Sequence, residues 1–400
     1  MSLTTADPAT ILVRGGQVVD GTGAPRPADV VVAGTRISAV IDRDGADGPS
    51  VAPPEPGGTA SVVDARGCLV LPGLIDLHTH VFAPGTGLGV APDTVGVDQA
   101  VTTVVDAGST GARDFARFRE DVVAPARTRV LSWLNIAEPG LVDGLSELAD
   151  LSAVATPATA QLLASQIAED AGDRIVRGIK VRMSSSVTRG TGTAGLARAL
   201  ELADAHGLPV MVHVGNEPPT LVEVAAMLRP GDVITHAFHG KAGGLFDDAG
   251  YLHRGVVRAR ERGVLFDVGH GSASLSFETV EHAIAEDFAP QLASTDLHAG
   301  NLDGPVHHLA MTMTKMLAVG LPLSDIVRAT TSAAADVISE TGRLGSLAPG
   351  ATADVSLLRI VERRVTLVDA EGATRDTDHV LEPVGAVVAG RPVTEAVVSR

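Results

Sequence analysis

The sequence is poor in cysteine and in aromatic side chains. Cys68 is the one cysteine among 400 residues, so no disulfide can form within the chain. Phe, Tyr and Trp together make up 2% of the residues, whereas hydrophobic residues as a whole make up 45%. A hydrophobic core must therefore be built mainly from Val, Leu, Ile and Ala.

Positive charge is also scarce. Acidic side chains number 48 and basic ones 31, which gives a formal net charge of -17. Nucleic acids and anionic membranes are bound through clustered Lys and Arg, so this balance argues against both as the main partner. It does not argue against a small anionic substrate, which responds to the local field of a metal site rather than to net charge.

Long hydrophobic runs are missing as well. No stretch of about 20 uninterrupted apolar residues is present to span a bilayer. Residues 1–10 contain no basic segment followed by an apolar one, so no signal peptide is visible. We therefore expect a cytoplasmic protein that acts on a small molecule.

The two ends of the chain show the pattern of short β-strands. Residues 9–70 contain strand-like runs separated by Gly-rich turns and by a loop rich in Pro, Gly and Asp at 41–60. Three further runs of this kind lie between residues 345 and 400. We expect residues 1–67 and 345–400 to build one small β-sandwich domain together.

Residues 68–344 follow a different pattern, in which short apolar runs alternate with helical segments. This alternation is typical of repeated βα units around a parallel sheet. Eight such units fit a (β/α)8 barrel of the α/β class, which usually needs about 250 residues. An open doubly wound sheet is the structural alternative. The expected strands are the run ending at His80 and residues 102–106, 129–136, 175–183, 209–213, 233–236, 264–268 and 292–296.

The first of these runs, residues 69–80, ends in two histidines separated by one residue. In a strand, residues i and i+2 point to the same face, so His78 and His80 point the same way. Two imidazoles at the end of a buried strand are half of a divalent-metal site. A pair of packed or surface histidines is the alternative, because short motifs often match by chance.

Four more polar side chains lie at the ends of other expected strands. They are Lys180 on the fourth strand, His213 on the fifth, His236 on the sixth and Asp296 on the eighth. A barrel places its active site at this end of its strands. The six side chains, each in this position, are a far more specific signal than any one histidine.

With these residues identified, the chain resembles metal-dependent hydrolases of the amidohydrolase superfamily. The resemblance is to the binuclear subgroup that includes dihydroorotase-like enzymes and deacetylases. It covers nearly the whole chain and is specific for the superfamily rather than for one substrate. The segments that carry it are residues 72–80, 178–182, 212–219, 235–236, 294–296 and 345–354.

The resemblance implies two divalent cations, with zinc expected. It assigns His78, His80 and Asp296 to the buried ion, His213 and His236 to the exposed ion, and Lys180 to both ions as a bridging carbamate formed with CO2.

Physical chemistry supports the assignment of Lys180. Burial beside positive charge lowers the pKa of a lysine, and the neutral amine can react with CO2 to give an anion with two oxygen donors. An ion pair between Lys180 and Asp296 without a bridge is the simpler alternative. Asp296 is also the expected catalytic residue, which takes a proton from the attacking water and delivers it to the leaving group.

Several other side chains near the expected strand ends are candidates for substrate contacts. Arg182 lies two residues after Lys180, and its guanidinium group suits a carboxylate. A salt bridge from Arg182 to a neighbouring loop is the alternative. The remaining candidates, each also explained by ordinary loop packing, are Ser109, Asn216, His239, His270 and His298.

The residues around the motifs narrow the expected substrate class. Dihydroorotases usually carry an arginine soon after the two histidines, whereas residues 81–85 contain none. D-aminoacylases of this superfamily use a cysteine ligand, whereas Cys68 precedes the first histidine by ten residues and is expected in the core. The deacetylase-like members resemble the chain better. We therefore expect hydrolysis of an N-acetyl amide or O-acetyl ester next to a carboxylate, as in an N-acyl-D-amino acid or an acetylated 2-hydroxy acid.

Two other functions stay open at this point. One is a cyclic-amide hydrolase, similar to dihydroorotase or hydantoinase, or a deaminase that uses the same metals. The other is a catalytically inactive homologue that serves as a scaffold, although a complete ligand set argues against it. A homo-oligomer is compatible with the resemblance, but the sequence marks no interface.

Overall fold

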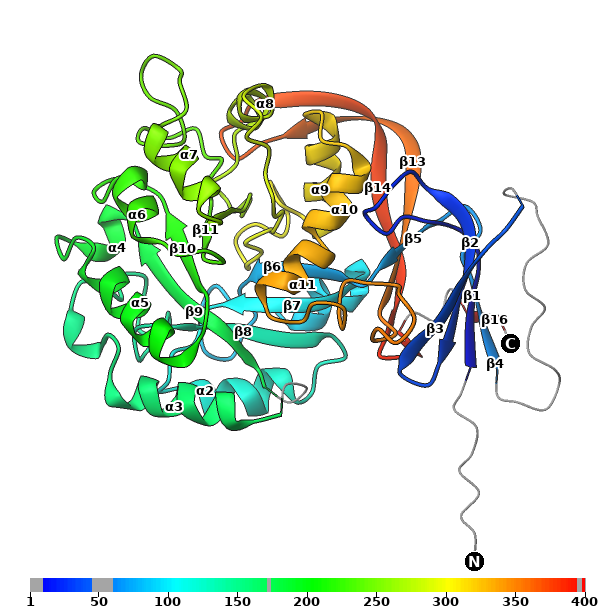
Figure 1. Cartoon of the computed structure of the whole chain (residues 1–400), viewed down its shortest axis with the longest axis horizontal. Helices are drawn as coiled ribbons and strands as arrows, with labels where there is room; N and C mark the ends of the chain where they lie inside the picture. Colours follow the sequence, from blue (N-terminus) through cyan, green and yellow to red (C-terminus); the bar gives the residue numbers. More distant parts are fainter. Residues whose placement is uncertain (1–9, 45–59, 171–173, 394–397, 400) are drawn as a thin grey trace, which may run out of the picture.

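The computed structural model describes residues 10–44, 60–170, 174–393 and 398–399. These residues form a curved parallel sheet ringed by helices and a second sheet built from the two ends of the chain, as Figure 1 shows. The expected fold class, a (β/α)8 barrel with a small β domain, is confirmed.

The parallel sheet contains the expected strands in chain order, each hydrogen-bonded to the next. It consists of β6 (Leu74–Thr79), β7 (Val101–Ala107), β8 (Arg129–Asn135), β9 (Val176–Met183), β10 (Val210–Val214), β11 (Val233–Thr235) and β12 (Leu265–Phe266).

Residues 292–297 take the place of the eighth strand and close the ring. Parallel bridges join Asp267 to Leu292 and Thr79 to Leu297, so this segment lies between β12 and β6. Asp296 has a left-handed backbone with φ 53°, which interrupts the extended conformation. The eighth strand is therefore held by isolated bridges instead of a continuous ladder.

Helices fill the intervals between the strands, and local sequence explains where several begin and end. In α6, Thr220 and Glu223 form a reciprocal capping box, and α3 begins with the cap Thr156 followed by a proline. The helix α5 ends at Gly207, which adopts φ 63°. The helices are α1 (Pro92–Val95), α2 (Phe115–Phe118), α3 (Pro157–Ala168), α4 (Ser185–Thr188), α5 (Ala194–His206), α6 (Leu221–Met227), α7 (Arg254–Glu261), α8 (Phe277–Ala285), α9 (Leu309–Ala318), α10 (Leu323–Ala329) and α11 (Ser332–Val337), and α2 continues into a π-helical segment at Arg119–Val123.

The barrel interior is packed around the single tryptophan. Trp133 on β8 is fully buried, and its indole N–H donates to the carbonyl oxygen of Leu77 at 3.0 Å. Gly178 on β9 makes room for the ring, because a Cβ at that position would lie 2.2 Å from Trp133 Cζ3. Side chains of β6, β7, β10 and α11 complete this core, so the barrel is a solid support for the residues at its strand ends.

The second sheet joins strands from both ends of the chain. Its element β5 pairs in parallel with β1 and antiparallel with β13, and a separate hydrophobic core packs around β1, β2 and β13. The division of the chain into residues 1–67 with 345–400 and residues 68–344 stays a prediction. The strands are β1 (Thr10–Val18), β2 (Arg26–Ala33), β3 (Arg36–Asp42), β4 (Ala60–Asp64), β5 (Leu69–Pro72), β13 (Val355–Val368), β14 (Thr374–Val388), β15 (Arg391–Pro392) and β16 (Val398–Ser399).

The long hairpin of β13 and β14 reaches from this sheet to the barrel helices, as the orange and red ribbons of Figure 1 show. At its tip, Asp369 accepts a hydrogen bond from the backbone N–H of Phe277, at the start of α8. Glu371 accepts one from the backbone N–H of Gly240, in the loop after β11. The small sheet therefore also fixes part of the rim of the barrel. Within the described residues, no helix combines the length and apolar character needed to cross a bilayer.

Candidate metal centre

Two histidines and an aspartate meet at the carboxyl end of the barrel strands. The ligand atoms of His78, His80 and Asp296 all lie within 4.8 Å of one another. Each histidine Nε2 is 3.2 Å from Asp296 Oδ1, and both imidazoles are buried. Two imidazoles and one carboxylate around a common point are donors that suit a divalent cation.

Each of the two imidazoles is oriented by a hydrogen bond at Nδ1, so that its Nε2 faces Asp296. The Thr235 hydroxyl donates to Asp267 at 2.7 Å, so its oxygen accepts from His78 Nδ1, 2.9 Å away. His80 Nδ1 lies 2.9 Å from the hydroxyl of Ser109. With Nδ1 carrying the proton, each Nε2 lone pair is free for a metal ion, as is common for metal-binding histidines.

Asp296 is placed by the unusual backbone that interrupts the eighth strand. Its N–H donates to the carbonyl oxygen of His78 at 2.7 Å, and its own carbonyl oxygen accepts from the Asn301 side chain at 2.9 Å. Gly271 (φ 52°) allows this close approach, since a Cβ there would lie 2.7 Å from Asp296 Oδ2. The carboxylate is therefore fixed against the two histidines by backbone contacts.

Lys180, His213 and His236 extend the cluster. Lys180 Nζ is 3.2 Å from His78 Nε2. The ring centroids of His213 and His236 are 4.5 Å apart, and those of His78 and His236 are 4.9 Å apart. The structure thus brings together all six side chains that the sequence proposed as ligands.

His236 shows most directly that these residues fit a bound cation. Its Nδ1 is hydrogen-bonded to the carbonyl oxygen of Gly269, so its Nε2 is a bare acceptor. This Nε2 is buried, lies 3.8 Å from Asp296 Oδ2, and has no hydrogen-bond partner among the described residues. A metal ion would satisfy a buried nitrogen that the protein itself leaves unbonded.

Burial sets the protonation of these groups. It lowers the pKa of His78 and His213 well below the usual range, and that of His236 to about 3. Burial also lowers the pKa of Lys180 to about 7. Neutral imidazoles and a partly neutral amine at pH 7 are the states that metal binding and reaction with CO2 require.

Asp296 is shifted toward its charged form, whereas the histidines and Lys180 are shifted toward their neutral forms. Burial alone would raise its pKa, but the neighbouring rings of His78, His80 and His236 hold it well below the usual value. The carboxylate is therefore ionised at neutral pH and can act as a ligand or accept a proton.

Three of the substrate-contact candidates are held by protein groups. Arg182 forms an ion pair of 3.1 Å with the buried Glu147, and Ser109 is bonded to His80. His270 Nε2 lies 2.7 Å from the Nζ of Lys315. The guanidinium group of Arg182, the hydroxyl of Ser109 and the Nε2 of His270 are therefore already engaged by other groups of the protein.

The other three candidates lie in the loops around the centre. The His298 ring centroid is 6.5 Å from that of His80, and its Nε2 is 3.2 Å from the Ser272 hydroxyl. Asn216 follows β10, and its backbone N–H donates to the hydroxyl of Ser184. His239 follows β11 and is buried, with an Nε2 that has no hydrogen-bond partner in the part of the chain that the structure describes.

Two contributors to the centre were missed by reasoning from the sequence. Thr235 and Asp267 orient His78 by a chain of hydrogen bonds that crosses from β11 to the end of β12. The only signal in the sequence was their place at the ends of expected strands, where Asp296 and the histidines also stand.

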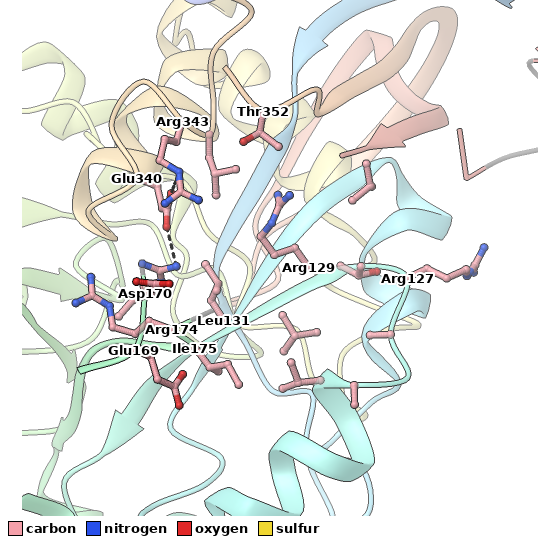
Figure 2. Close-up of a pocket in the computed structure, with 18 of the residues that line it drawn as sticks. Arg127, Arg129, Leu131, Glu169, Asp170, Arg174, Ile175, Glu340, Arg343 and Thr352 are labelled. Atoms are coloured by element: carbon pink, nitrogen blue, oxygen red, sulfur yellow. Dashed lines mark ion pairs between the residues drawn. The ribbon is translucent and has the colours of Figure 1, made fainter. Parts of the chain in front are cut away.

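A cavity of about 860 Å³ lies at the opposite end of the barrel. It opens at the amino ends of β8 and β9, and Arg129, Arg174 and Glu340 are among its lining residues (Figure 2). Glu340 pairs there with Arg177 at 2.7 Å and with Arg343 at 3.3 Å. Barrel enzymes carry their chemistry at the carboxyl ends of the strands, so this cavity is not the catalytic site.

Comparison with known proteins identifies the class of this fold and site. The model of the amidohydrolase family matches residues 69–391, which is most of the chain. The chain belongs to that family and is a hydrolytic enzyme, so the resemblance drawn from its motifs is confirmed.

Several relatives have names that describe a particular activity. The chain is 34% identical to a deacetylase of Enterococcus faecalis, over 95% of this chain and 98% of that protein. It is 35% identical to a deacetylase of Agrobacterium fabrum, over 83% of this chain and 80% of that protein. Solved structures described as an adenine deaminase and a dihydroorotase superpose with TM-scores of 0.85 and 0.83, each at 32% identity and covering 96% of this chain and 99% of the other.

Proposed function

We propose that this chain is a metal-dependent deacetylase that hydrolyses an N-acetyl amide or O-acetyl ester next to a carboxylate. N-acyl-D-amino acids and acetylated 2-hydroxy acids are the expected substrates. The observation that carries the proposal is the convergence of six potential ligands at the carboxyl end of the barrel. The relatives named deacetylases, similar over most of their length, support the choice of reaction.

The metal assignment follows from the positions of the six side chains. We assign His78, His80 and Asp296 to one divalent cation, His213 and His236 to a second, and Lys180 to both as a carbamate. Zinc is the metal we propose, because imidazole and carboxylate ligands suit it. Cations bound there would polarise the acyl carbonyl and lower the pKa of water, so that water can attack at neutral pH.

Side chains of the protein would transfer the proton from the attacking water to the leaving group. Asp296 is ionised at neutral pH, so it can accept a proton from the attacking water and pass it to the leaving nitrogen or oxygen. Thr235 and Ser109 keep His78 and His80 in one orientation during this exchange. Lys180, with a pKa of about 7, has the neutral amine that carbamate formation needs.

A cyclic-amide hydrolase or a deaminase is the second candidate. The observation in its favour is the similarity to solved structures described as a dihydroorotase and an adenine deaminase. We prefer the deacetylase because residues 81–85 lack the arginine that the dihydroorotase resemblance calls for.

A substrate panel tests the proposal. Protein supplied with zinc and bicarbonate would be assayed with N-acetyl-D- and N-acetyl-L-amino acids, acetyl-mandelates, dihydroorotate, hydantoins and adenine. We expect release of acetate, its loss after chelation and its return with zinc. Turnover confined to dihydroorotate, hydantoins or adenine would replace the deacetylase with the second candidate.

A cytoplasmic location, a small-molecule substrate in place of nucleic acid or membrane, and self-association stay predictions. Light scattering of the purified protein would test the last of these.

A further inference from the structure

A positive side chain beside the proposed metal centre would orient the carboxylate of the proposed substrate. Two cations at this end of the barrel are already engaged. Arg182 pairs with Glu147, and Lys315 donates to His270 and to the carbonyl oxygen of Pro305. Neither can bind a substrate carboxylate without giving up a buried partner, which would cost binding energy.

Lys241 is different. It lies five residues after His236, in the loop that follows β11, and its side chain is partly buried. Within the described ranges, no ion pair or hydrogen bond of its Nζ is seen. Burial lowers the pKa of Lys241, and the carboxylate of Glu371 opposes that shift.

His239 supplies a donor on the same loop. Its Nδ1 accepts a hydrogen bond from the backbone N–H of Lys241 at 3.1 Å, so the ring hydrogen is on Nε2. The residue is 2% exposed, and this Nε2 has no partner among the residues that the structure describes. A buried donor without a protein acceptor is a place for a ligand atom.

Contacts with distant parts of the chain hold this loop in place. Glu371, from the β13–β14 hairpin, accepts from the N–H of Gly240 at 3.0 Å. On the other side Gly243 packs against Glu217, because a Cβ at Gly243 would lie 2.7 Å from Glu217 Oε2. Glu217 lies in the loop after His213, so Lys241 is carried beside the His213 and His236 half of the centre.

We propose that Lys241 and the Nε2–H of His239 bind the carboxylate of the substrate and select acetylated acids over neutral acetylated compounds. A carboxylate accepts from an ammonium group and from an N–H donor at once, which suits this pair. The inference rests on the proposed deacetylase function and names the residues that give it specificity.

The test compares Lys241→Met with the wild type on matched substrates, an N-acetyl amino acid and its carboxamide. We expect kcat/KM for the acid to fall about 10- to 100-fold in the variant, as for loss of one charge-assisted hydrogen bond. The value for the carboxamide should stay within about threefold. Lys241→Arg should keep part of the preference for the acid. Arg364→Met, which removes an exposed charge on β13, is the control and should leave kcat/KM unchanged for both substrates. Zinc content measured on each variant separates substrate binding from damage to the centre.

The outcomes separate this inference from the function on which it rests. A wild type that releases acetate and prefers the acid, with a Lys241→Met variant that keeps the preference, overturns the role of Lys241 alone. Equal losses for acid and carboxamide, or a wild type without preference, also overturn it. A wild type that releases no acetate from any acetylated compound overturns the deacetylase proposal, and the inference falls with it.

Discussion

At the scale of single residues, the histidines proposed as metal ligands depend on hydrogen-bond partners that are not themselves proposed ligands. Thr235 is such a partner, because its hydroxyl gives its only proton to Asp267 and so must accept from His78. This arrangement selects one tautomer of His78 and fixes its ring plane.

Thr235→Val should therefore weaken metal binding with little change in shape. Valine has a similar size but no hydroxyl, so His78 loses its orienting acceptor. We expect the affinity for zinc to fall about 10- to 100-fold, as for other residues that orient metal ligands. Competition with a chromophoric chelator measures the affinity. Thr377→Val, on the exposed hairpin, is the control, and equal affinity in all three proteins would contradict the role of Thr235.

Asp296→Asn tests the proton transfer. Asparagine keeps the shape of the side chain but cannot accept the proton that ionised Asp296 would take. We expect kcat to fall by about 10²- to 10⁴-fold. Metal analysis of the same sample distinguishes lost proton transfer from lost metal. A variant that retains its metal and turns over at nearly the wild-type rate would refute the proton role.

Lys315 makes stability depend on pH in a definite direction. Burial lowers its pKa to about 8, whereas a lysine in the unfolded chain titrates near 10.4. Between these values the unfolded chain holds a proton that the folded chain has released, so the free energy of unfolding rises with pH. In Lys315→Met this contribution is missing.

Urea denaturation of both proteins at about pH 8 and about pH 10 measures the effect. The stability of the wild type relative to Lys315→Met should increase by about 1–3 kcal/mol over that interval. Parallel pH dependence of the two proteins would show that Lys315 titrates normally in the folded state.

At the scale of elements, β8 and β9 are fitted to each other through Trp133 and Gly178. Gly178→Ala would place a methyl group against the indole ring, since a Cβ there lies 2.2 Å from Trp133 Cζ3. We expect a loss of about 1–3 kcal/mol in the free energy of unfolding, typical of overpacking. Trp133 is the only tryptophan in the chain, so its fluorescence reports this contact directly.

Gly87→Ala is the matched control for that experiment. A Cβ at Gly87 would meet no described atom within 4 Å, so stability should change by less than about 0.5 kcal/mol. Equal stability and equal fluorescence in Gly178→Ala and the wild type would mean that the two strands are not closely fitted.

The order of the elements could be predicted from the sequence because each apolar run is local. The predicted strand 129–136 is observed as Arg129–Asn135, and the predicted strand 175–183 as Val176–Met183. The eighth strand is reduced to bridges because Asp296 takes a left-handed backbone that no apolar pattern signals.

The convergence of the proposed ligands was also predictable, because a closed barrel brings the ends of all its strands to one face. The partners of the loop residues could not be predicted from the sequence. Glu147 lies 35 residues before Arg182, and Glu371 reaches Gly240 from the far end of the chain. Such contacts depend on tertiary structure, which periodicity does not encode.

At the scale of the whole molecule, the proposed metal centre and a buried ion pair lie at opposite ends of the barrel. The proposed metal centre lies at the carboxyl ends of the strands, and the arginine-lined cavity of Figure 2 lies at the amino ends. The side chains of Arg177 and Glu340 are each 2% exposed in the ion pair that joins β9 to the segment after α11.

Glu340→Gln should therefore reduce stability without changing the chemistry. The substitution removes the charge that compensates a buried guanidinium group, and we expect a loss of about 3 kcal/mol in the free energy of unfolding. Asp376→Asn, which breaks an exposed pair with Arg364, should cost less than about 1 kcal/mol. Denaturant titration compares the two, and kcat of the folded Glu340→Gln protein should match the wild type. Equal stability of the two variants would contradict a structural role for the buried pair.

Metal analysis by plasma mass spectrometry tests the assignment of the six converging side chains most directly. Wild-type protein prepared with zinc and bicarbonate should carry about two divalent ions per chain, and Lys180→Ala should carry fewer, with activity lost in parallel. Wild-type protein that retains no ion after the same treatment, while it still releases acetate, would contradict the account.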